Sequence, residues 1–141
     1  MDMVGIAECA ARECVRQNVG LDRLSLLIAS YAVLACKSGD LKPNFAQYIA
    51  GCIEPDNKGQ FRKTPVTFAN GGSSANWQDI PRQWQILFDN QPSDEISSTN
   101  WLRHLLWVHP FSDGNGRLAW LLWNYYSGDM SHALPLPDFG W

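Results

Sequence analysis

The stretch between residues 109 and 117 is the most polar part of its neighbourhood, and it separates two strongly apolar segments. It reads His109-Pro110-Phe111-Ser112-Asp113-Gly114-Asn115-Gly116-Arg117. Apolar residues recur at helical spacing before it, over 101–108, and after it, over 118–125, so the sequence predicts two helices joined by this loop. A hydrophobic core does not need such a cluster of polar residues and glycines, which indicates a binding or catalytic loop.

The residue types in this loop suit the chemistry of phosphate esters. A helix that begins at Asn115 or Gly116 would direct its free amide hydrogens into the loop, where they and the helix dipole favour an anion. Arg117 adds a permanently charged planar group. Asp113 is an oxygen ligand of the kind that Mg²⁺ prefers, and the His109 imidazole can accept a proton from a hydroxyl near neutral pH. The loop is therefore predicted to perform phosphoryl or nucleotidyl transfer.

Helical periodicity extends over most of the remaining chain. The apolar positions predict further helices over 7–17, 24–36, 45–53 and 80–88. Residues 97–100 are expected to cap the helix that precedes the loop. Residues 59–72 combine β-branched and aromatic residues with flanking glycines, which predicts a β-hairpin, and Pro65 would place its strand at an edge. The tail over 134–141 is expected to be extended. The fold class is therefore mainly α, in a single domain spanning 1–141.

Length, charge and cysteine use exclude several classes of protein. The 141 residues are 45% hydrophobic, enough for one domain with a core. The net charge of −3 gives no basic surface for nucleic acid. The apolar stretch over 24–36 is too short to cross a membrane, and the N-terminus does not resemble a signal peptide. The four cysteines lie within the first 52 residues without a CxxC pair and are expected to be reduced core thiols. We expect a cytoplasmic protein, with delivery into another cell as the alternative.

The loop also resembles a known family. Residues 109–117 match the signature HPFx(D/E)GNGR of the Fic (Fido) family at every defined position. Residues 61–72, here called the flap, look like the β-hairpin flap of that family. Leu134-Pro135-Leu136-Pro137 is similar to the segment that follows the helix after the signature. The resemblance covers residues 45–138, which would form the core that bears the signature.

The resemblance implies a fold, a reaction and a set of roles. The fold would be a helical core with a small β-hairpin flap. The reaction would be Mg²⁺-dependent transfer of AMP from ATP to a serine, threonine or tyrosine hydroxyl of a target protein, with release of pyrophosphate. The roles implied are general base for His109, Mg²⁺ ligand for Asp113, α-phosphate contact for Asn115, anion hole for the Gly114 and Gly116 backbone, β-phosphate clamp for Arg117 and structural anchor for Phe111. The flap residues Thr64, Val66, Thr67 and Phe68 would hold the target segment by strand addition.

One position departs from the longer family pattern GNGRxxR, because Trp120 stands where the second arginine would be. Its side chain could fill the region of the γ-phosphate or pack into the core. The inhibitory pattern (S/T)xxxE(G/N) of the family is also not found: over 25–30, Ala29 occupies the glutamate position. Three accounts follow, namely an unregulated toxin-like transferase, one restrained by a separate inhibitory or antitoxin protein, or an enzyme whose donor or reaction has changed.

Two other functions stay open at this point. One is a catalytically weak module that binds a nucleotide or a partner. The other is protein phosphotransfer, as in the Doc branch, whose signature resembles HxFxDANKR; Pro110, Gly114 and Gly116 favour nucleotidyl transfer instead. Arg62 and Lys63 beside the flap could contact an acidic target, but we interpret them as charges that keep an edge strand soluble.

Overall fold

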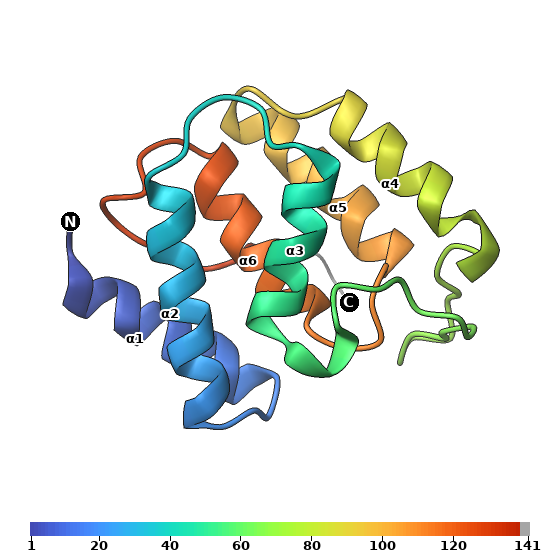
Figure 1. Ribbon diagram of the computed structural model, residues 1–141, viewed down its shortest axis with the longest axis horizontal. Coiled ribbons are helices and arrows are strands. Elements are labelled where there is room, and N and C mark those ends of the chain that lie inside the picture. Colours follow the sequence, from blue (N-terminus) through green and yellow to red (C-terminus); the bar gives the residue numbers. More distant parts are fainter. Residues whose placement is uncertain (139–141) are drawn as a thin grey trace.

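Helix α6 (Asn115–Tyr126) lies at the centre of the fold, and ten of its 12 residues are buried (Figure 1). A helix that is apolar on all sides is stable only when other elements cover it. Those elements are α1 (Met3–Arg16), α2 (Leu21–Ala35), α3 (Pro43–Ile53) and α5 (Glu95–Val108), all of which contact α6. The loop over 109–114 precedes α6 directly, so it is attached to the most enclosed element of the molecule.

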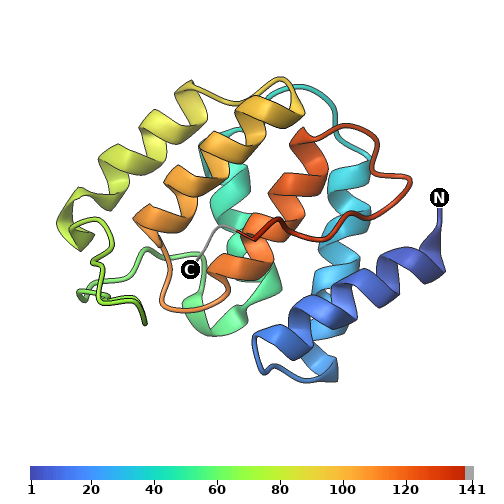
Figure 2. The same ribbon diagram turned by 180° about the vertical axis from the view of Figure 1, so that it is seen from behind.

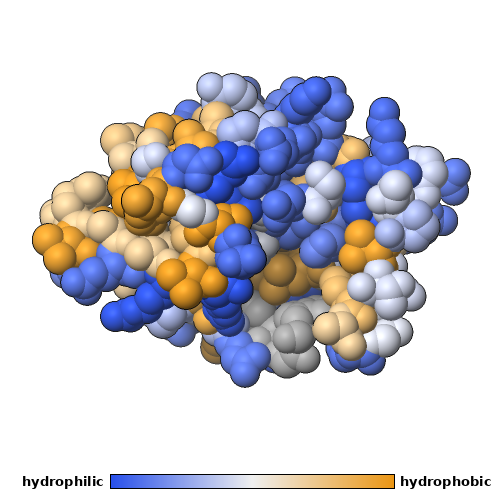
Figure 3. Space-filling view, turned by 90° about the horizontal axis from the view of Figure 1, so that it is seen from below, coloured by the Kyte–Doolittle hydropathy of each residue, from blue (hydrophilic) through white to orange (hydrophobic). Residues whose placement is uncertain are grey.

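The computed structural model describes residues 1–138 as a mainly helical domain. Helix α4 (Ile80–Asp89) packs on α5, and the short 3-10 helices η1 (Pro55–Asn57) and η2 (Trp77–Asp79) flank the segment that contains the flap. Apolar side chains gather on the left of the face in Figure 3. The exposed apolar residues of α1 and α2 include Val4, Val15 and Leu21. No helix within residues 1–138 has the length and apolar character needed to span a membrane.

The predicted helices are confirmed, with shifted ends. The segments predicted at 7–17, 24–36, 45–53 and 80–88 correspond to α1, α2, α3 and α4. The expected cap of α5 within 97–100 is wrong. The helix begins at Glu95, because the Asp94 carboxylate accepts a hydrogen bond of 2.7 Å from the Ser97 amide. Ser97 returns a contact to the Asp94 backbone, which completes a capping box one turn earlier than predicted.

The predicted β-hairpin is not present as a pair of strands in the part of the chain that the structure describes. A single antiparallel bridge joins Thr67 to Ser73. Around it, the Phe68 amide donates to the Gly72 carbonyl at 2.7 Å, and the Ser74 amide donates to the Val66 carbonyl at 3.2 Å. The pairing extends no further because Pro65 has no amide hydrogen to donate to a ladder. The flap is therefore a tight turn, and the Arg62 side chain anchors its base by donating to the carbonyls of Thr64 and Ala75.

The four cysteines are free thiols, as predicted, but only two belong to the core. Cys9 and Cys14 are buried, and burial is the main cause that raises the pKa of each thiol. Cys36, at the C-terminal end of α2, is exposed, so its assignment to the core is wrong. That residue follows the last helical turn, where the periodicity of the apolar face no longer applies.

The segment after α6 crosses back over that helix (Figure 2). Asn124 holds it from both sides: its Oδ1 accepts from the Leu134 amide at 2.7 Å, and its Nδ2 donates to the Leu134 carbonyl at 3.0 Å. The Tyr31 hydroxyl donates to the Met130 carbonyl at 2.7 Å. Residues 134–138 have no regular secondary structure, in agreement with the predicted extended tail, and 139–141 lie outside the described residues.

Trp120 is packed into the core, which decides between its two interpretations. The side chain is 0% exposed. Its indole N–H donates to the Leu134 carbonyl at 2.9 Å and to the Cys9 sulfur at 3.3 Å, and its ring lies 5.6 Å from that of Tyr31. The indole thus joins α1, α2 and the tail to α6. The interpretation that it fills a γ-phosphate site is wrong.

Candidate functional site

The loop that carries the polar cluster depends on two left-handed backbone conformations. His109 ends α5 with φ 49°, and Gly114 precedes α6 with φ 85°. A side chain at Gly114 would also be strained by contact, because a Cβ there would lie 2.9 Å from the Glu54 Cβ. Between these turns, Phe111 is 0% exposed and packs edge-on against Trp84, with ring centroids 5.5 Å apart. Phe111 therefore lies where an anchor is expected.

Asn115 braces the loop from its other end. Its Oδ1 accepts from the Phe111 amide at 3.0 Å, and its Nδ2 donates to the Phe111 carbonyl at 2.8 Å. The side chain is buried but borders the cavity beside His109. In this structure Asn115 fixes the loop, while its predicted contact with an α-phosphate stays a prediction.

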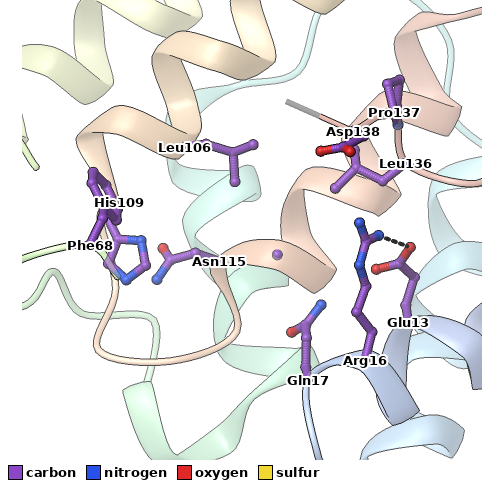
Figure 4. A pocket seen from close by; sticks show the side chains of 11 residues that line it. Glu13, Arg16, Gln17, Phe68, Leu106, His109, Asn115, Leu136, Pro137 and Asp138 are labelled. Atoms are coloured by element: carbon purple, nitrogen blue, oxygen red, sulfur yellow. Dashed lines mark hydrogen bonds and ion pairs between the residues drawn. The ribbon is translucent and has the colours of Figure 1, made fainter. Parts of the chain in front are cut away.

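A cavity of about 280 Å³ opens between α1, the loop, α5 and the tail (Figure 4). Its lining residues are Glu13, Arg16, Gln17, Phe68, Leu106, His109, Asn115, Gly116, Leu136, Pro137 and Asp138. A second hollow, of about 300 Å³, lies on the other side of the loop and is lined by Asp113, Ser112 and Gly114. The two share Gln17, His109, Asn115 and Gly116, so they flank the same end of α6.

His109 lies between the cavity and the flap. Its imidazole faces the cavity, and the Phe68 ring of the flap meets it edge-on at 5.7 Å. Burial lowers its pKa most, and the positive charge of Arg62 lowers it further, while Asp113 acts in the opposite direction. The imidazole is therefore neutral at neutral pH, which is the form that accepts a proton.

The first turn of α6 offers backbone donors at the same place. Gly114 is the residue before the helix, and the helix begins without a side-chain cap. The amides of an uncapped helix start favour a bound anion. A Cβ on Gly116 would lie 2.7 Å from Gln17 Nε2, so a larger residue here would displace Gln17 from the cavity wall. Both glycines thus lie where a side chain would collide with a neighbour, and the anion hole predicted for their backbone stays a prediction.

Asp113 is the exposed carboxylate of the loop. Its side chain is 61% exposed, and its Oδ1 accepts from the Gly114 amide at 2.8 Å. Among residues 1–138, no three His, Cys, Asp or Glu side chains lie close enough together to form a metal site by themselves. A single accessible carboxylate beside an anion cradle fits Mg²⁺, which proteins commonly hold by one or two carboxylates plus substrate phosphates.

Arg117 is placed differently from the other loop residues. Its side chain is 0% exposed, and its guanidinium donates to Gln17 Oε1 at 3.0 Å, to the Ile53 carbonyl at 3.1 Å and to Glu54 Oε1 at 3.2 Å. Asp113 Oδ1 lies 3.5 Å away. Arg117 here ties α1, α3 and the loop together, and the β-phosphate clamp implied for it stays a prediction.

No motif or spacing in the sequence marks the acid that neutralises Arg117. Glu54 is 1% exposed and also accepts hydrogen bonds from Arg23 Nε and from the Asp56 amide, both at 3.0 Å. Burial alone would raise the pKa of Glu54, but the bonds from Arg23, Asp56 and Arg117 outweigh it and lower the pKa. Gln17, Glu13 and Arg16 were also not singled out, because α1 contains no motif.

The hydrogen bonds of Glu54 predict that the free energy of unfolding decreases on acidification. The folded protein binds fewer protons at Glu54 than the unfolded chain does. The stabilisation is therefore present above the ordinary glutamate pKa and is lost as the pH falls through the lowered value. Glu54→Gln should cost about 3–5 kcal/mol near neutral pH, because it leaves Arg117 buried without its partner. It should also flatten the decline in stability on acidification.

Urea unfolding at about pH 7 and about pH 3 measures both effects. Asp56→Asn is the matched control, since Asp56 pairs with the same Arg23 but its side chain is 80% exposed. A Glu54→Gln variant whose stability falls on acidification as steeply as that of the natural protein would contradict the prediction.

The flap residues predicted to bind the target differ in exposure. Thr64 and Thr67 are exposed, whereas Val66 and Phe68 are half-buried. The structure thus brings His109, Asn115, Gly116 and Phe68 to one cavity, and places Asp113 and Gly114 in the adjoining hollow.

Comparison with known proteins adds one finding. A family model described as the Fic/DOC family matches residues 40–127, which is more than half of the chain. The match includes α3 to α6, the flap and the whole of the loop. No curated protein matches the chain.

Proposed function

Because the chain belongs to the Fic/DOC family, we propose that it transfers AMP from ATP to a hydroxyl side chain of a target protein and releases pyrophosphate. The family points to nucleotidyl or phosphoryl transfer to proteins in general. The observation that carries the finer proposal is the placement of a neutral His109 between the flap and the uncapped start of α6. The base, the target-binding edge and the anion cradle of the proposed reaction would meet there.

The residues suggest an in-line displacement. His109 would accept the proton of the target hydroxyl, and the hydroxyl oxygen would form a bond to the α-phosphorus. The bond from that phosphorus to the oxygen that bridges to the β-phosphate would break, so pyrophosphate leaves with the electron pair. The amides at the start of α6 would stabilise negative charge on the phosphates. Asp113 would hold Mg²⁺, which supplies further neutralisation of that charge.

The cavity supports a nucleotide as the donor. Leu106, Leu136 and Pro137 form an apolar wall suited to a flat base, and Gln17 and Glu13 supply polar groups beside it. Its volume of about 280 Å³ lies just below the range of roughly 300–1,000 Å³ that is usual for ligand sites. It would therefore take one nucleoside, while the phosphates extend toward the hollow at Asp113.

The experiment is mass spectrometry of the intact protein and of proteins in a cell lysate after incubation with Mg²⁺ and each of ATP, GTP, CTP and UTP. A gain of one nucleoside monophosphate, labelled from α-labelled ATP, supports the proposal. A gain of a bare phosphate from γ-labelled ATP replaces it with Doc-like phosphotransfer. Binding of ATP without any covalent gain replaces it with a nucleotide-binding module. A gain of one nucleoside monophosphate that appears only with GTP, CTP or UTP would identify that nucleotide as the donor in place of ATP.

Restraint of the reaction is proposed to come from outside the chain. The described residues place Glu54, a buried acid, on Arg117, but this contact holds the loop together and leaves the cavity open. A separate inhibitory protein would therefore have to cover the cavity or the flap. Growth of a host that expresses the chain, with and without candidate inhibitors, tests this partner.

A further inference from the structure

Arg62 lies beneath the loop, although the sequence suggested an exposed charge. Its side chain is turned inward and is only 4% exposed, so the interpretation as a solubilising residue is wrong. Its backbone amide donates to the Pro110 carbonyl at 2.8 Å, which holds the start of the flap against the loop. The neighbouring Lys63 is exposed and fits the original interpretation. The inward turn of Arg62 therefore needs a separate explanation.

The guanidinium of Arg62 connects two parts of the site. On one side, Nε donates to the His109 carbonyl at 2.6 Å and Nη2 to the Val108 carbonyl at 3.0 Å. On the other side, Nη1 donates to the Thr64 carbonyl at 2.6 Å. Nη2 also reaches the far arm of the turn, at Ser74 Oγ and the Ala75 carbonyl, at 2.8 and 2.7 Å. Both arms of the turn and the end of α5 thus share one side chain.

These contacts take the place of two sets of backbone hydrogen bonds, those of a continued α5 helix and those of a longer β-hairpin. The carbonyls of Val108 and His109 belong to the last turn of α5 and have no following helical amide. The carbonyls of Thr64 and Ala75 would accept from a β-ladder in a longer hairpin. Arg62 satisfies both sets with a rigid fork of donors, which a lysine cannot reproduce.

No carboxylate among residues 1–138 forms an ion pair with Arg62. The ion pairs of that part of the chain do not include it. Only carbonyl and hydroxyl oxygens solvate the buried cation, although burying a charge is costly even when it is hydrogen-bonded. An apolar residue would avoid the cost of the buried charge but would leave the carbonyls on both sides unpaired, so the position requires the hydrogen bonds of an arginine and not packing alone.

On the basis of the proposed transfer reaction, we propose that Arg62 is a positioning residue that holds the base His109 and the target-binding flap as one unit. The left-handed backbone at His109 aims its imidazole into the cavity, and the bond from Arg62 to the His109 carbonyl fixes that turn. The bond to Thr64 fixes where the flap leaves the core. A target hydroxyl bound along the flap is thereby placed at a set distance from the base.

The charge of Arg62 has a second effect on His109, because a nearby cation disfavours the imidazolium form and lowers its pKa. The other charged groups around the imidazole are Asp113 on the loop, Glu13 and Arg16 on α1, and Asp138 on the tail. Of these, Asp113 raises the pKa of His109, in opposition to Arg62. Arg62 thus extends the range of pH over which the base is neutral.

Two variants separate geometry from charge. Arg62→Lys keeps the charge but loses the fork, and Arg62→Gln loses the charge but keeps two donors. Lys42→Gln is the control, since it removes an exposed positive charge just before α3, outside the flap and the loop. The imidazole titration of His109 is followed by NMR in the protein without nucleotide, with the resonance assigned by its loss in His109→Ala. The kcat and the KM for ATP are measured across pH on the same variants.

Arg62→Gln is expected to raise the pKa of His109 and to move the acid limb of kcat/KM to higher pH. Arg62→Lys is expected to leave the titration near that of the natural protein but to lower kcat at least about tenfold with little change in KM. Lys42→Gln should change neither the titration nor kcat. If Arg62→Gln does not fold, Arg62→Lys decides alone. A normal kcat in Arg62→Lys, or a lowered melting temperature with unchanged titration and kcat, would overturn the proposal.

The titration also separates this proposal from the transfer reaction. If the chain transfers no group but Arg62→Gln still shifts the titration of His109, the proposed function is wrong, and the coupling between Arg62 and His109 is nevertheless supported. An active chain whose titration and kcat ignore both variants retains the proposed function and overturns the role of Arg62.

Discussion

Replacement of His109 by alanine should lower group transfer by about 10²–10⁴-fold, the contribution typical of a general base. The change removes the proton acceptor but leaves the start of α6, Asp113 and the apolar cavity wall in place. The affinity for ATP should therefore stay within about threefold of that of the natural protein. Transfer is measured by mass spectrometry or label incorporation, and ATP affinity by calorimetry.

Two controls guard against an effect on folding. The left-handed backbone at position 109 costs alanine about 1–2 kcal/mol, whereas asparagine adopts it readily, so His109→Asn should be equally inactive but more stable. His104→Ala removes another histidine of α5, whose imidazole contacts Gln83 at 2.9 Å and does not line the cavity, and it should keep full activity. More than a few per cent of activity in both His109 variants would refute the assignment of the base.

Trp120→Arg should destabilise the fold strongly instead of restoring a phosphate contact. The substitution removes an indole that is 0% exposed, its hydrogen bond to Leu134 and its contact with Tyr31. Loss of a buried tryptophan alone costs about 3–5 kcal/mol, and an unpaired buried charge adds to this. The free energy of unfolding should fall by at least about 3 kcal/mol, and the melting temperature by about 10 °C or more.

Thermal unfolding and ATP titration measure the two sides of this prediction. Trp107→Arg is the matched control, because Trp107 lies on α5 and is 39% exposed, so its cost should stay below about 1 kcal/mol. A stable Trp120→Arg variant that binds ATP more tightly would show instead that position 120 reaches the triphosphate.

The helices of this chain were predictable because their apolar periodicity reflects burial against a common core. The residues of the loop were predictable for the same local reason: Gly114, Asn115 and Gly116 encode the turn and the helix start on their own. The flap was not. Its alternation of β-branched residues suits a hairpin, but the anchor that replaces the missing ladder is Arg62, and its acceptors at Val108 and His109 are distant in sequence.

The partners of Arg117 show the same limit more sharply. Gln17 lies 100 residues before it and Glu54 lies 63 residues before it. No spacing within the chain distinguishes these two polar residues from others at helix ends. Only the packing of α1 and α3 around α6 brings them to the guanidinium, so an arginine that the signature marks for phosphate binding is found in a buried network.

The burial of α6 sets an order in which parts of the site would exchange amide hydrogens with water. Beyond the first turn, whose amides have no helical acceptor, the amides within α6 open only when the surrounding helices separate, so they should exchange near the rate of global unfolding. The flap, with a single bridge and exposed threonines, should exchange early. The helix that carries the cradle would thus be ordered before a nucleotide binds. The entropic cost of ordering the flap would arise only when the target binds. Selection among targets would then occur at the flap, after the donor is already in place.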